Sequence, residues 1–424
     1  APVGGIKRFD LSIEERTHTF FEGIKTRTFG IDADYLGPTL LLRRGEQVSI
    51  GYTNRLAEAT TMHGHGMHLP ASMDGGPHQI IRPGETWRAE YTVSQKACTN
   101  WYHPHYMGKT AEHVYKGLAG MIIVEDGESA ALNLPNTYGV DDIPLVIQDR
   151  RFDANGQIDY SPSRMEIMQG YRGDTHIVNG VIEPTFFAGA GQLRLRLLNG
   201  SNAEVYRIGF DDNRSFSMIA GDNSFLEAPV TMNEVRLSPG ERAEIVVDLS
   251  KDAGGSVILQ ERSRPGTLLQ LSVSGDTGRT GPLPAKLSTL DRPDPAAAVR
   301  TRTFRLSGQM GRFYINGKSM DMDVINETVP LDAIEIWEVF NGMGMPHNFH
   351  IHATHFLLLE RDGSAASVAE SEKGYKDTVY LPPNGRVKLL VTMTDYSDAV
   401  NPYMYHCHFL EHEDAGMMGQ FVTV

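Results

Sequence analysis

The chain lacks most of the features of disulfide-rich, membrane-spanning or nucleic-acid-binding proteins. Only two of its 424 residues are cysteines, Cys98 and Cys407, so at most one internal disulfide could form. No run of about 18 or more consecutive apolar residues is present, so we expect no membrane-spanning helix. The formal charge of −14 argues against nucleic acid as a partner, because contact with phosphates needs an excess of Lys and Arg.

Stretches with the periodicity of an amphipathic helix are also few. Glycine (43) and proline (22) are plentiful instead, and short alternating strands lie between turn signals. These features predict an all-β protein of the sandwich or Greek-key barrel type. The length exceeds that of one ordinary domain and indicates two or three.

Two patterns occur three times along the chain. A turn with proline precedes an alternating strand at residues 82–93, 237–247 and 381–391, with the shared prolines at positions 83, 239 and 383. A second pattern precedes each copy, at residues 37–54, 179–200 and 316–342. The repeat unit of about 140 residues is a common domain size. We therefore predict domains over residues 1–130, 131–280 and 301–424, with the Pro-rich residues 281–300 as a linker.

The chain opens with Ala1-Pro2-Val3 rather than with methionine. This is typical of a mature chain after removal of an export signal, although another truncation would leave the same start. We expect a periplasmic or secreted protein. If Cys407 binds a metal, Cys98 has no disulfide partner, and we expect it to be a small buried apolar residue.

Histidines are concentrated in a way that indicates a metal cluster. Ten of the sixteen lie in four stretches, residues 61–66, 101–105, 347–352 and 405–417, and each stretch contains His-x-His. On a strand, residues i and i+2 share a face, so each pair can bind one metal or two neighbouring metals. Four pairs offer eight imidazoles, more than one zinc ion takes.

The last stretch also offers sulfur ligands. Cys407, His412 and Met417 with one further histidine would make the His₂Cys site with a weak axial Met that suits electron-transfer copper. We predict a strand here, so that His406 and His408 face away from Cys407 and reach a second metal centre. The alternative is a His-rich loop around a buried thiol.

The four stretches, with Gly117-Leu118-Ala119-Gly120 after the second, resemble the copper-binding motifs of the multicopper oxidases. The resemblance is to the bacterial three-domain cuprous oxidase and laccase type, and it covers nearly the whole chain. It implies three cupredoxin domains, with a trinuclear copper cluster between the first and third. It also implies four coppers per chain and the coupling of four one-electron oxidations to reduction of O₂ to two waters.

The resemblance assigns a role to each residue that matches a motif position. The middle domain would donate no ligand, consistent with its single histidine, His176. Type 1 copper would be held by His347, Cys407, His412 and axial Met417, type 2 copper by His63 and His350, and the type 3 pair by His65, His103, His105, His352, His406 and His408.

Two carboxylates also match family positions at which protons pass to dioxygen, Asp74 and Glu413. Reduction of O₂ consumes protons as well as electrons, so carboxylates near the cluster have a chemical purpose. The alternatives are a turn residue before Gly75-Gly76 and a solvated loop charge.

Three positions depart from the family pattern. Gly64 stands where Trp is usual, Asn348 follows His347 where Pro is usual, and Ala353 follows His352. The spacing of the histidines is unchanged, so we expect ligation to survive.

The sequence is compatible with two kinds of electron donor. Met343 and Met345 precede His347, and Met320 and Met322 lie in the same domain; thioethers suit Cu(I). A long Met-rich insertion, frequent in cuprous oxidases of this type, is absent, and Met343 replaces an acidic residue. We therefore expect both oxidation of Cu(I), in copper homeostasis, and laccase-like oxidation of phenols and aromatic amines. We also expect the protein to be a monomer.

Three other classes of protein fit the sequence less well. A copper nitrite reductase would need neither the second histidine of His406-Cys407-His408 nor three domains. A non-enzymatic cupredoxin scaffold would be expected to lose the ligands, and a copper store would not need the cysteine between two histidines.

Overall fold

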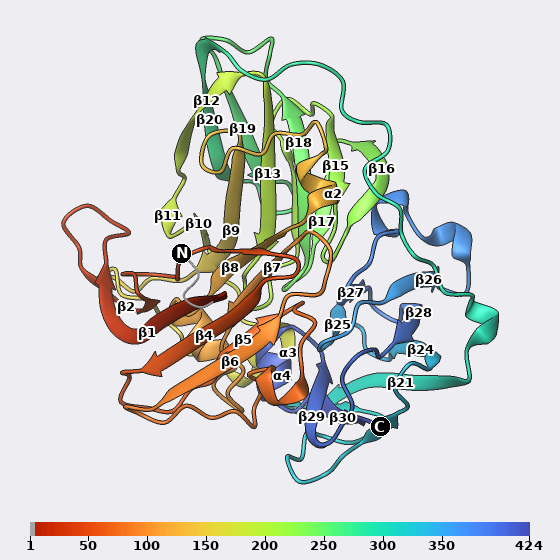
Figure 1. Cartoon of the computed structure of the whole chain (residues 1–424). Coiled ribbons are helices and arrows are strands. Elements are labelled where there is room, and N and C mark those ends of the chain that lie inside the picture. The colour runs from red at the N-terminus through yellow and green to blue at the C-terminus, as the bar shows by residue number, and fades with distance from the viewer. Residues whose placement is uncertain (1–4) are drawn as a thin grey trace.

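The structure, a computed structural model, describes residues 5–424 and consists of strands with a few short helices (Figure 1). Within this range there are thirty strands in six sheets and four α-helices, α1 (Thr110–Lys116), α2 (Gly127–Ala130), α3 (Arg164–Gln169) and α4 (Leu410–Asp414). Ala1-Pro2-Val3, on which the prediction of a removed export signal rests, lies outside the described residues. No helix in residues 5–424 combines the length and hydropathy that a membrane crossing requires.

The first domain consists of two four-stranded sheets. Their strands in spatial order are β2 (Thr26–Ile31), β1 (Ile6–His18), β4 (Gln47–Asn54) and β6 (Thr86–Thr92), and β3 (Leu40–Arg43), β8 (Gly120–Glu125), β7 (Cys98–His103) and β5 (His63–His65). Apolar side chains of both sheets form one buried core, to which Cys98 belongs with 1% of its surface exposed. The prediction that Cys98 is a buried apolar residue without a disulfide is confirmed.

The middle domain has a seven-stranded and a five-stranded sheet. The strands are β11 (Val181–Ile182), β10 (Thr175–Val178), β9 (Asp142–Arg150), β13 (Gln192–Asn199), β18 (Arg242–Asp248), β15 (Phe216–Ala220) and β16 (Phe225–Met232), and then β12 (Thr185–Ala190), β20 (Gly266–Thr277), β19 (Ser256–Glu261), β14 (Tyr206–Phe210) and β17 (Val235–Leu237). Between β20 and the next strand the chain is irregular apart from a 3₁₀ turn at Pro295–Ala297. Leu287 of this segment is buried against the middle domain.

The third domain has two five-stranded sheets. The strands are β22 (Arg312–Ile315), β21 (Arg300–Gln309), β24 (Ile334–Asn341), β28 (Arg386–Thr392) and β26 (Leu357–Arg361), and then β23 (Glu327–Val329), β30 (Met418–Thr423), β29 (Asp398–His406), β25 (His347–Ile351) and β27 (Thr378–Leu381). Its apolar core includes Cys407 and Met417, both fully buried.

The threefold repeat of the sequence corresponds to a repeated arrangement of strands and asparagines. The proline turns lead into β6, β18 and β28, each antiparallel to the strand of the second pattern, β4, β13 or β24. Each of these partner strands ends in an asparagine, Asn54, Asn199 or Asn341. In all three, the side-chain amide donates hydrogen bonds to backbone carbonyls close to the proline turn and in the following loop. The same polar side chain therefore satisfies buried backbone groups at the same place in each domain.

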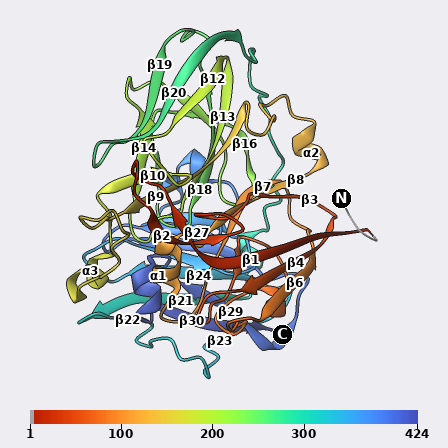
Figure 2. The same ribbon diagram turned by 90° about the vertical axis from the view of Figure 1, so that its left-hand side faces the viewer.

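The first and third domains lie side by side with the middle domain against both (Figures 1 and 2). Helix α1 of the first domain packs on α4 of the third. The Asp414 carboxylate at the end of α4 accepts hydrogen bonds from the backbone N–H groups of Thr110 and Ala111 at the start of α1. Such a carboxylate satisfies amides that have no partner within the helix. This contact places α4, with His412 and Glu413, against the first domain.

Candidate metal centres

The four His-x-His stretches meet at the boundary between the first and third domains, near strands β5 and β7 of the first and β25 and β29 of the third. His63 of β5 pairs with His103 of β7, and His350 of β25 pairs with His406 of β29. The rings of His65 and His350 stack across the domain boundary with their centroids 3.8 Å apart. Residues far apart in the sequence therefore contribute to one buried cluster.

The eight imidazoles form three groups, two of which share His65, and in each group the potential ligand atoms lie within 4.8 Å of one another. In one group, Nε2 of His105 and Nε2 of His352 each lie 3.1 Å from Nε2 of His406. The groups are His63, His65 and His350; His65, His103 and His408; and His105, His352 and His406. All eight side chains are buried.

Hydrogen bonds hold several of these imidazoles by one nitrogen and leave the other without a partner. Nδ1 of His63 lies 2.7 Å from the Asp74 carbonyl oxygen, and Nδ1 of His350 lies 2.9 Å from that of Asp377. Nε2 of both residues is buried with no hydrogen-bond partner, as are both ring nitrogens of His408. An unpartnered buried nitrogen costs free energy that a bound metal ion would remove, so these residues fit a metal cluster.

The protonation of these side chains also suits ligation. Burial lowers the pKa of His350 to about 4 and that of His347 to about 3, so both imidazoles are neutral near pH 7. Only a neutral imidazole has a free lone pair for a metal.

A fourth group combines nitrogen and sulfur. Sγ of Cys407 lies 3.4 Å from Nδ1 of His347 and 3.8 Å from Nδ1 of His412, and the two Nδ1 atoms are 3.0 Å apart. Phe313 stacks on the His412 ring at 4.2 Å, and Met417 is buried in the same apolar core. Burial raises the pKa of the Cys407 thiol to about 12, so a cation would be needed to hold it as a thiolate near pH 7.

The prediction that one strand carries the residues from Tyr405 to His408 is wrong in its extent. Strand β29 ends at His406, and helix α4 begins at Leu410. Beyond His406 the backbone finds other partners, because the N–H of Cys407 donates to the Met417 carbonyl oxygen and the N–H of His408 donates to Oδ1 of Asn348.

Cys407 and its neighbours His406 and His408 nevertheless point in opposite directions, as predicted. The Cys407 side chain joins His347 and His412, whereas His406 and His408 each belong to a group of imidazoles on the other side. A bend with its own hydrogen bonds thus produces the arrangement that alternation along a strand was expected to give.

The two predicted carboxylates both face the imidazole cluster. Oδ2 of Asp74 lies 2.7 Å from Nδ1 of His352. The Glu413 oxygens lie 3.3 Å from Nδ1 of His105 and 3.2 Å from Nδ1 of His406. Both carboxylates are only 1% exposed, so neither Asp74 nor Glu413 is a solvated surface charge.

Two positions that depart from the expected motifs are accommodated locally. Gly64 lies over Met67, whose Cγ would be 3.3 Å from an added Cβ. Asn348 is buried, and its side-chain amide donates to the Pro239 carbonyl oxygen of the middle domain. The Asn348 side chain also accepts a hydrogen bond from the backbone N–H of His408, so it links the residues of the metal centres to the middle domain.

Sequence reasoning missed two residues at the cluster, Asp377 and Arg242. Both are fully buried, and Asp377 contacts His65 and His350. The available signal was a Lys-Asp pair directly before the buried strand β27, but a charged pair in that position is usually on the surface.

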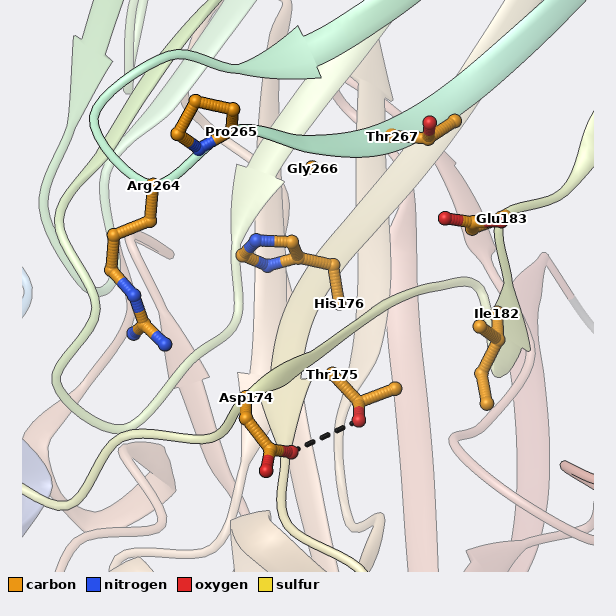
Figure 3. A pocket seen from close by; sticks show the side chains of 9 residues that line it. All are labelled: Asp174, Thr175, His176, Ile182, Glu183, Arg264, Pro265, Gly266 and Thr267. Atoms are coloured by element: carbon orange, nitrogen blue, oxygen red, sulfur yellow. Dashed lines mark hydrogen bonds between the residues drawn. The ribbon is translucent and has the colours of Figure 1, made fainter.

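A cavity of about 520 Å³ is lined by residues of the middle domain (Figure 3). His176 points into it between Arg264 and Glu183. None of the residues that line this cavity belongs to the four groups described above, and His176 therefore has no part in them.

Comparison with known proteins identifies the family. Two models of multicopper oxidase domains match the chain, one over residues 12–129 and the other over residues 285–424. The chain belongs to the multicopper oxidase family. Membership supports an oxidoreductase function and implies that the protein binds copper, as the donor atoms of the four groups also indicate.

Relatives with two different names resemble this multicopper oxidase over almost its whole length. It is 37% identical to the multicopper oxidase mco of Staphylococcus epidermidis over 420 residues, which is 98% of this chain and 88% of the relative. It is 38% identical to the cell division protein FtsP of Yersinia pestis over 427 residues, which is 97% of this chain and 88% of the relative.

Solved structures confirm the predicted fold of three cupredoxin-like domains. The laccase-like multicopper oxidase CueO of Ochrobactrum sp. superposes with a TM-score of 0.93 at 37% identity, covering 100% of this chain and 98% of that one. A laccase of Pediococcus acidilactici has a TM-score of 0.93 at 33% identity, covering 100% of this chain and 91% of that one.

Proposed function

We propose that this multicopper oxidase binds four coppers and couples four one-electron oxidations of a donor to the reduction of O₂ to two waters. The observation that carries the proposal is the position of Cys407, whose thiol belongs to one group while its two neighbours belong to the imidazole groups. A protein that only stored copper would not need this connection.

Each predicted ligand receives a place within this proposal. Asp74 and Glu413 would act beside the cluster without binding copper. The ligands are His347, Cys407, His412 and axial Met417 for type 1 copper, His63 and His350 for type 2, and His65, His103, His105, His352, His406 and His408 for the type 3 pair.

Copper in these groups would supply the one-electron redox chemistry. The chain itself supplies a short covalent connection, because Cys407 is joined by peptide bonds to His406 and His408. It also supplies a dry environment, because all of these side chains are buried. As a ligand of the type 1 copper, the Met417 thioether would give that centre a lower potential than an apolar residue would.

Asp74 and Glu413 would hold and release the protons that O₂ reduction consumes. Each lies within hydrogen-bonding reach of imidazoles of the cluster and is closed off from solvent. A carboxylate in such a place can accept a proton from a water chain and pass it on.

Two donors are compatible with the surface near His347. Nε2 of the buried His347 lies 3.1 Å from Sδ of Met343, a half-buried side chain, so a thioether covers this edge of the imidazole. Met310 lies at the turn between β21 and β22 and is 87% exposed. Strand β22 carries Phe313, which stacks on His412. These thioethers favour Cu(I). The similarity to laccases supports phenols and aromatic amines as the second candidate.

The relatives named cell division protein FtsP support a second candidate function, a role in cell division, for which a cupredoxin scaffold without enzymatic activity would suffice. The complete set of donor residues in this chain argues against it. A copper nitrite reductase-like activity and a plain copper store are the remaining alternatives.

One experiment separates these functions. Copper per purified chain is measured together with the absorption spectrum and O₂ consumption with a phenol or Cu(I) as donor. We expect four coppers, an intense blue band and O₂ consumption with at least one donor. Fewer coppers without O₂ consumption would favour the scaffold, and four coppers without O₂ consumption the store. Consumption of nitrite in place of O₂ would favour the reductase.

The domain limits at 1–130, 131–280 and 301–424, the monomeric state and a periplasmic or secreted location stay predictions. Limited proteolysis tests the first, light scattering the second and cell fractionation the third.

A further inference from the structure

Arg242 lies where the three domains meet. It begins strand β18 of the middle domain and is 1% exposed. Its Nη1 and Nη2 donate to the two carboxylate oxygens of Asp377 in the third domain, at 2.8 and 2.7 Å. Its Nε donates to the Thr99 carbonyl oxygen at 2.8 Å, and Nη2 donates to Oδ1 of Asn100 at 2.6 Å, both in the first domain.

Asp377 connects this guanidinium to two imidazoles of the cluster. Its Oδ1 lies 2.9 Å from Nε2 of His65, and its backbone carbonyl oxygen lies 2.9 Å from Nδ1 of His350. The hydroxyl of Thr378 donates to the same Oδ1 at 2.7 Å. Asp377 thus contacts one imidazole from the first domain and one from the third.

These contacts decide which nitrogen of each imidazole is free. A carboxylate paired with Arg242 is ionised and only accepts hydrogen bonds, as does a carbonyl oxygen. His65 must therefore donate from Nε2, which leaves the lone pair on Nδ1, 3.5 Å from Nε2 of His103. His350 donates from Nδ1, and its Nε2 is the buried nitrogen without a partner.

We propose that Arg242 and Asp377 are positioning residues that select the tautomers of His65 and His350. Through them the middle domain, which offers no ligand, controls the copper affinity of the trinuclear site. This inference rests on the proposed function, because it concerns the copper that the cluster binds. A hydrogen bond to the second nitrogen of a metal-binding histidine orients the ring and strengthens ligation.

A second buried ion pair provides a matched control. Arg196 of the middle domain pairs with both oxygens of Asp142 at 2.7 Å and donates to the Thr99 hydroxyl of the first domain. It is 3% exposed, and none of its hydrogen bonds reaches a histidine of the four groups. Loss of the Arg196 guanidinium should lower the stability of the fold but leave copper binding at the imidazole cluster unchanged.

The test compares Asp377→Asn and Arg242→Lys with Arg196→Lys in the full chain. Three quantities are measured for each variant. They are the copper content during titration with a chelator, the type 2 signal in electron paramagnetic resonance, and the blue absorption of the Cys407 centre. We expect Asp377→Asn and Arg242→Lys to weaken copper binding at the cluster by about 10–100-fold and to alter the type 2 signal, with the blue band unchanged. Arg196→Lys should leave all three readouts as in the wild type.

A milder variant keeps the test decisive if Asp377→Asn does not fold. Thr378→Val removes only the hydroxyl beside Oδ1 of Asp377, and we expect a smaller loss of affinity in the same direction. Wild-type affinity and an unchanged type 2 signal in Arg242→Lys and in the Asp377 or Thr378 variant would overturn the proposal. Equal losses in Arg196→Lys, or parallel loss of the blue band, would also overturn it, because a general structural effect would then suffice. The copper count of the wild type tests the proposed function separately.

Discussion

Asp74 Oδ2 lies 2.7 Å from Nδ1 of His352, although 278 residues separate the two in the sequence. Asp74 follows a 3₁₀ turn of the first domain, and His352 lies in the third. Glu413 makes the converse contact, from the third domain to His105 of the first. Each carboxylate therefore reaches an imidazole of the other domain, and both contact the same group, His105, His352 and His406.

We expect Asp74→Asn to lower kcat for O₂ reduction by about 10²-fold or more, because an amide cannot carry the proton. The amide oxygen can still accept the hydrogen bond from His352, so copper content should be retained. The measurements are O₂ consumption as a function of pH and copper per chain. Asp10→Asn, at an exposed carboxylate beside Arg88, is the control. A wild-type kcat in Asp74→Asn would exclude a part in proton delivery.

Replacing Cys407 by Ser should abolish the blue colour and the oxidase activity together. A hydroxyl is a poor substitute for the thiolate as a ligand for this copper, and the short path to His406 and His408 loses its starting atom. Absorption spectra and O₂ consumption test this. Cys98→Ser is the control, because Cys98 is a buried thiol outside the four groups. Activity that persisted without Cys407 would contradict the proposed electron path.

Met343→Leu should separate the two candidate donors. Leucine keeps most of the volume but removes the thioether 3.1 Å from Nε2 of His347. If Cu(I) is the donor, kcat/KM for Cu(I) should fall while that for a phenol stays within a few-fold. Steady-state kinetics with both donors on the same preparation provide the comparison. Equal changes for the two donors would show that Met343 has only a packing role.

Gly66→Ala should destabilise the fold more than Gly84→Ala. Both glycines have a left-handed backbone, with φ of +79° and +82°, and each substitution should cost about 1–2 kcal/mol on that account. At position 66 the added Cβ would also lie 2.5 Å from Oδ1 of Asn100 and 2.7 Å from Oδ2 of Asp377, whereas no atom lies within 4 Å at position 84. Denaturant unfolding measures the free energy of unfolding of both variants. Equal losses of free energy would mean that Asn100 and Asp377 move aside without cost.

His355→Gln should make the stability of the protein less sensitive to acid. Burial lowers the pKa of His355 in the folded state to about 4, below the usual value of about 6.5 in an unfolded chain. Between these values the unfolded chain binds a proton that the folded protein does not, so the free energy of unfolding falls as the pH falls. Gln can still donate to the Gly66 carbonyl oxygen but cannot titrate. Denaturant unfolding at pH 7 and pH 5 should show a smaller loss in the variant; an unchanged loss would contradict this.

The all-β class, the repeat and the candidate ligands could all be predicted from the sequence because they depend on local spacing. His-x-His places two imidazoles a fixed distance apart, and the proline turns recur before equivalent strands. The extent of β29 could not be predicted, because its end depends on the bond that the His408 amide makes to Asn348, 60 residues away.

The sequence by itself determined which side chains can bind metal, since residue type and short-range spacing limit the donor atoms. Only the tertiary structure decided how the donors are grouped. Each of the three imidazole groups joins side chains of two domains, and the fourth group joins His347 to Cys407, 60 positions further along the third domain. The tertiary structure alone brought Asp377 and Arg242 to His65 and His350, because no local pattern shows that a charged residue will be buried against a partner more than 100 positions away.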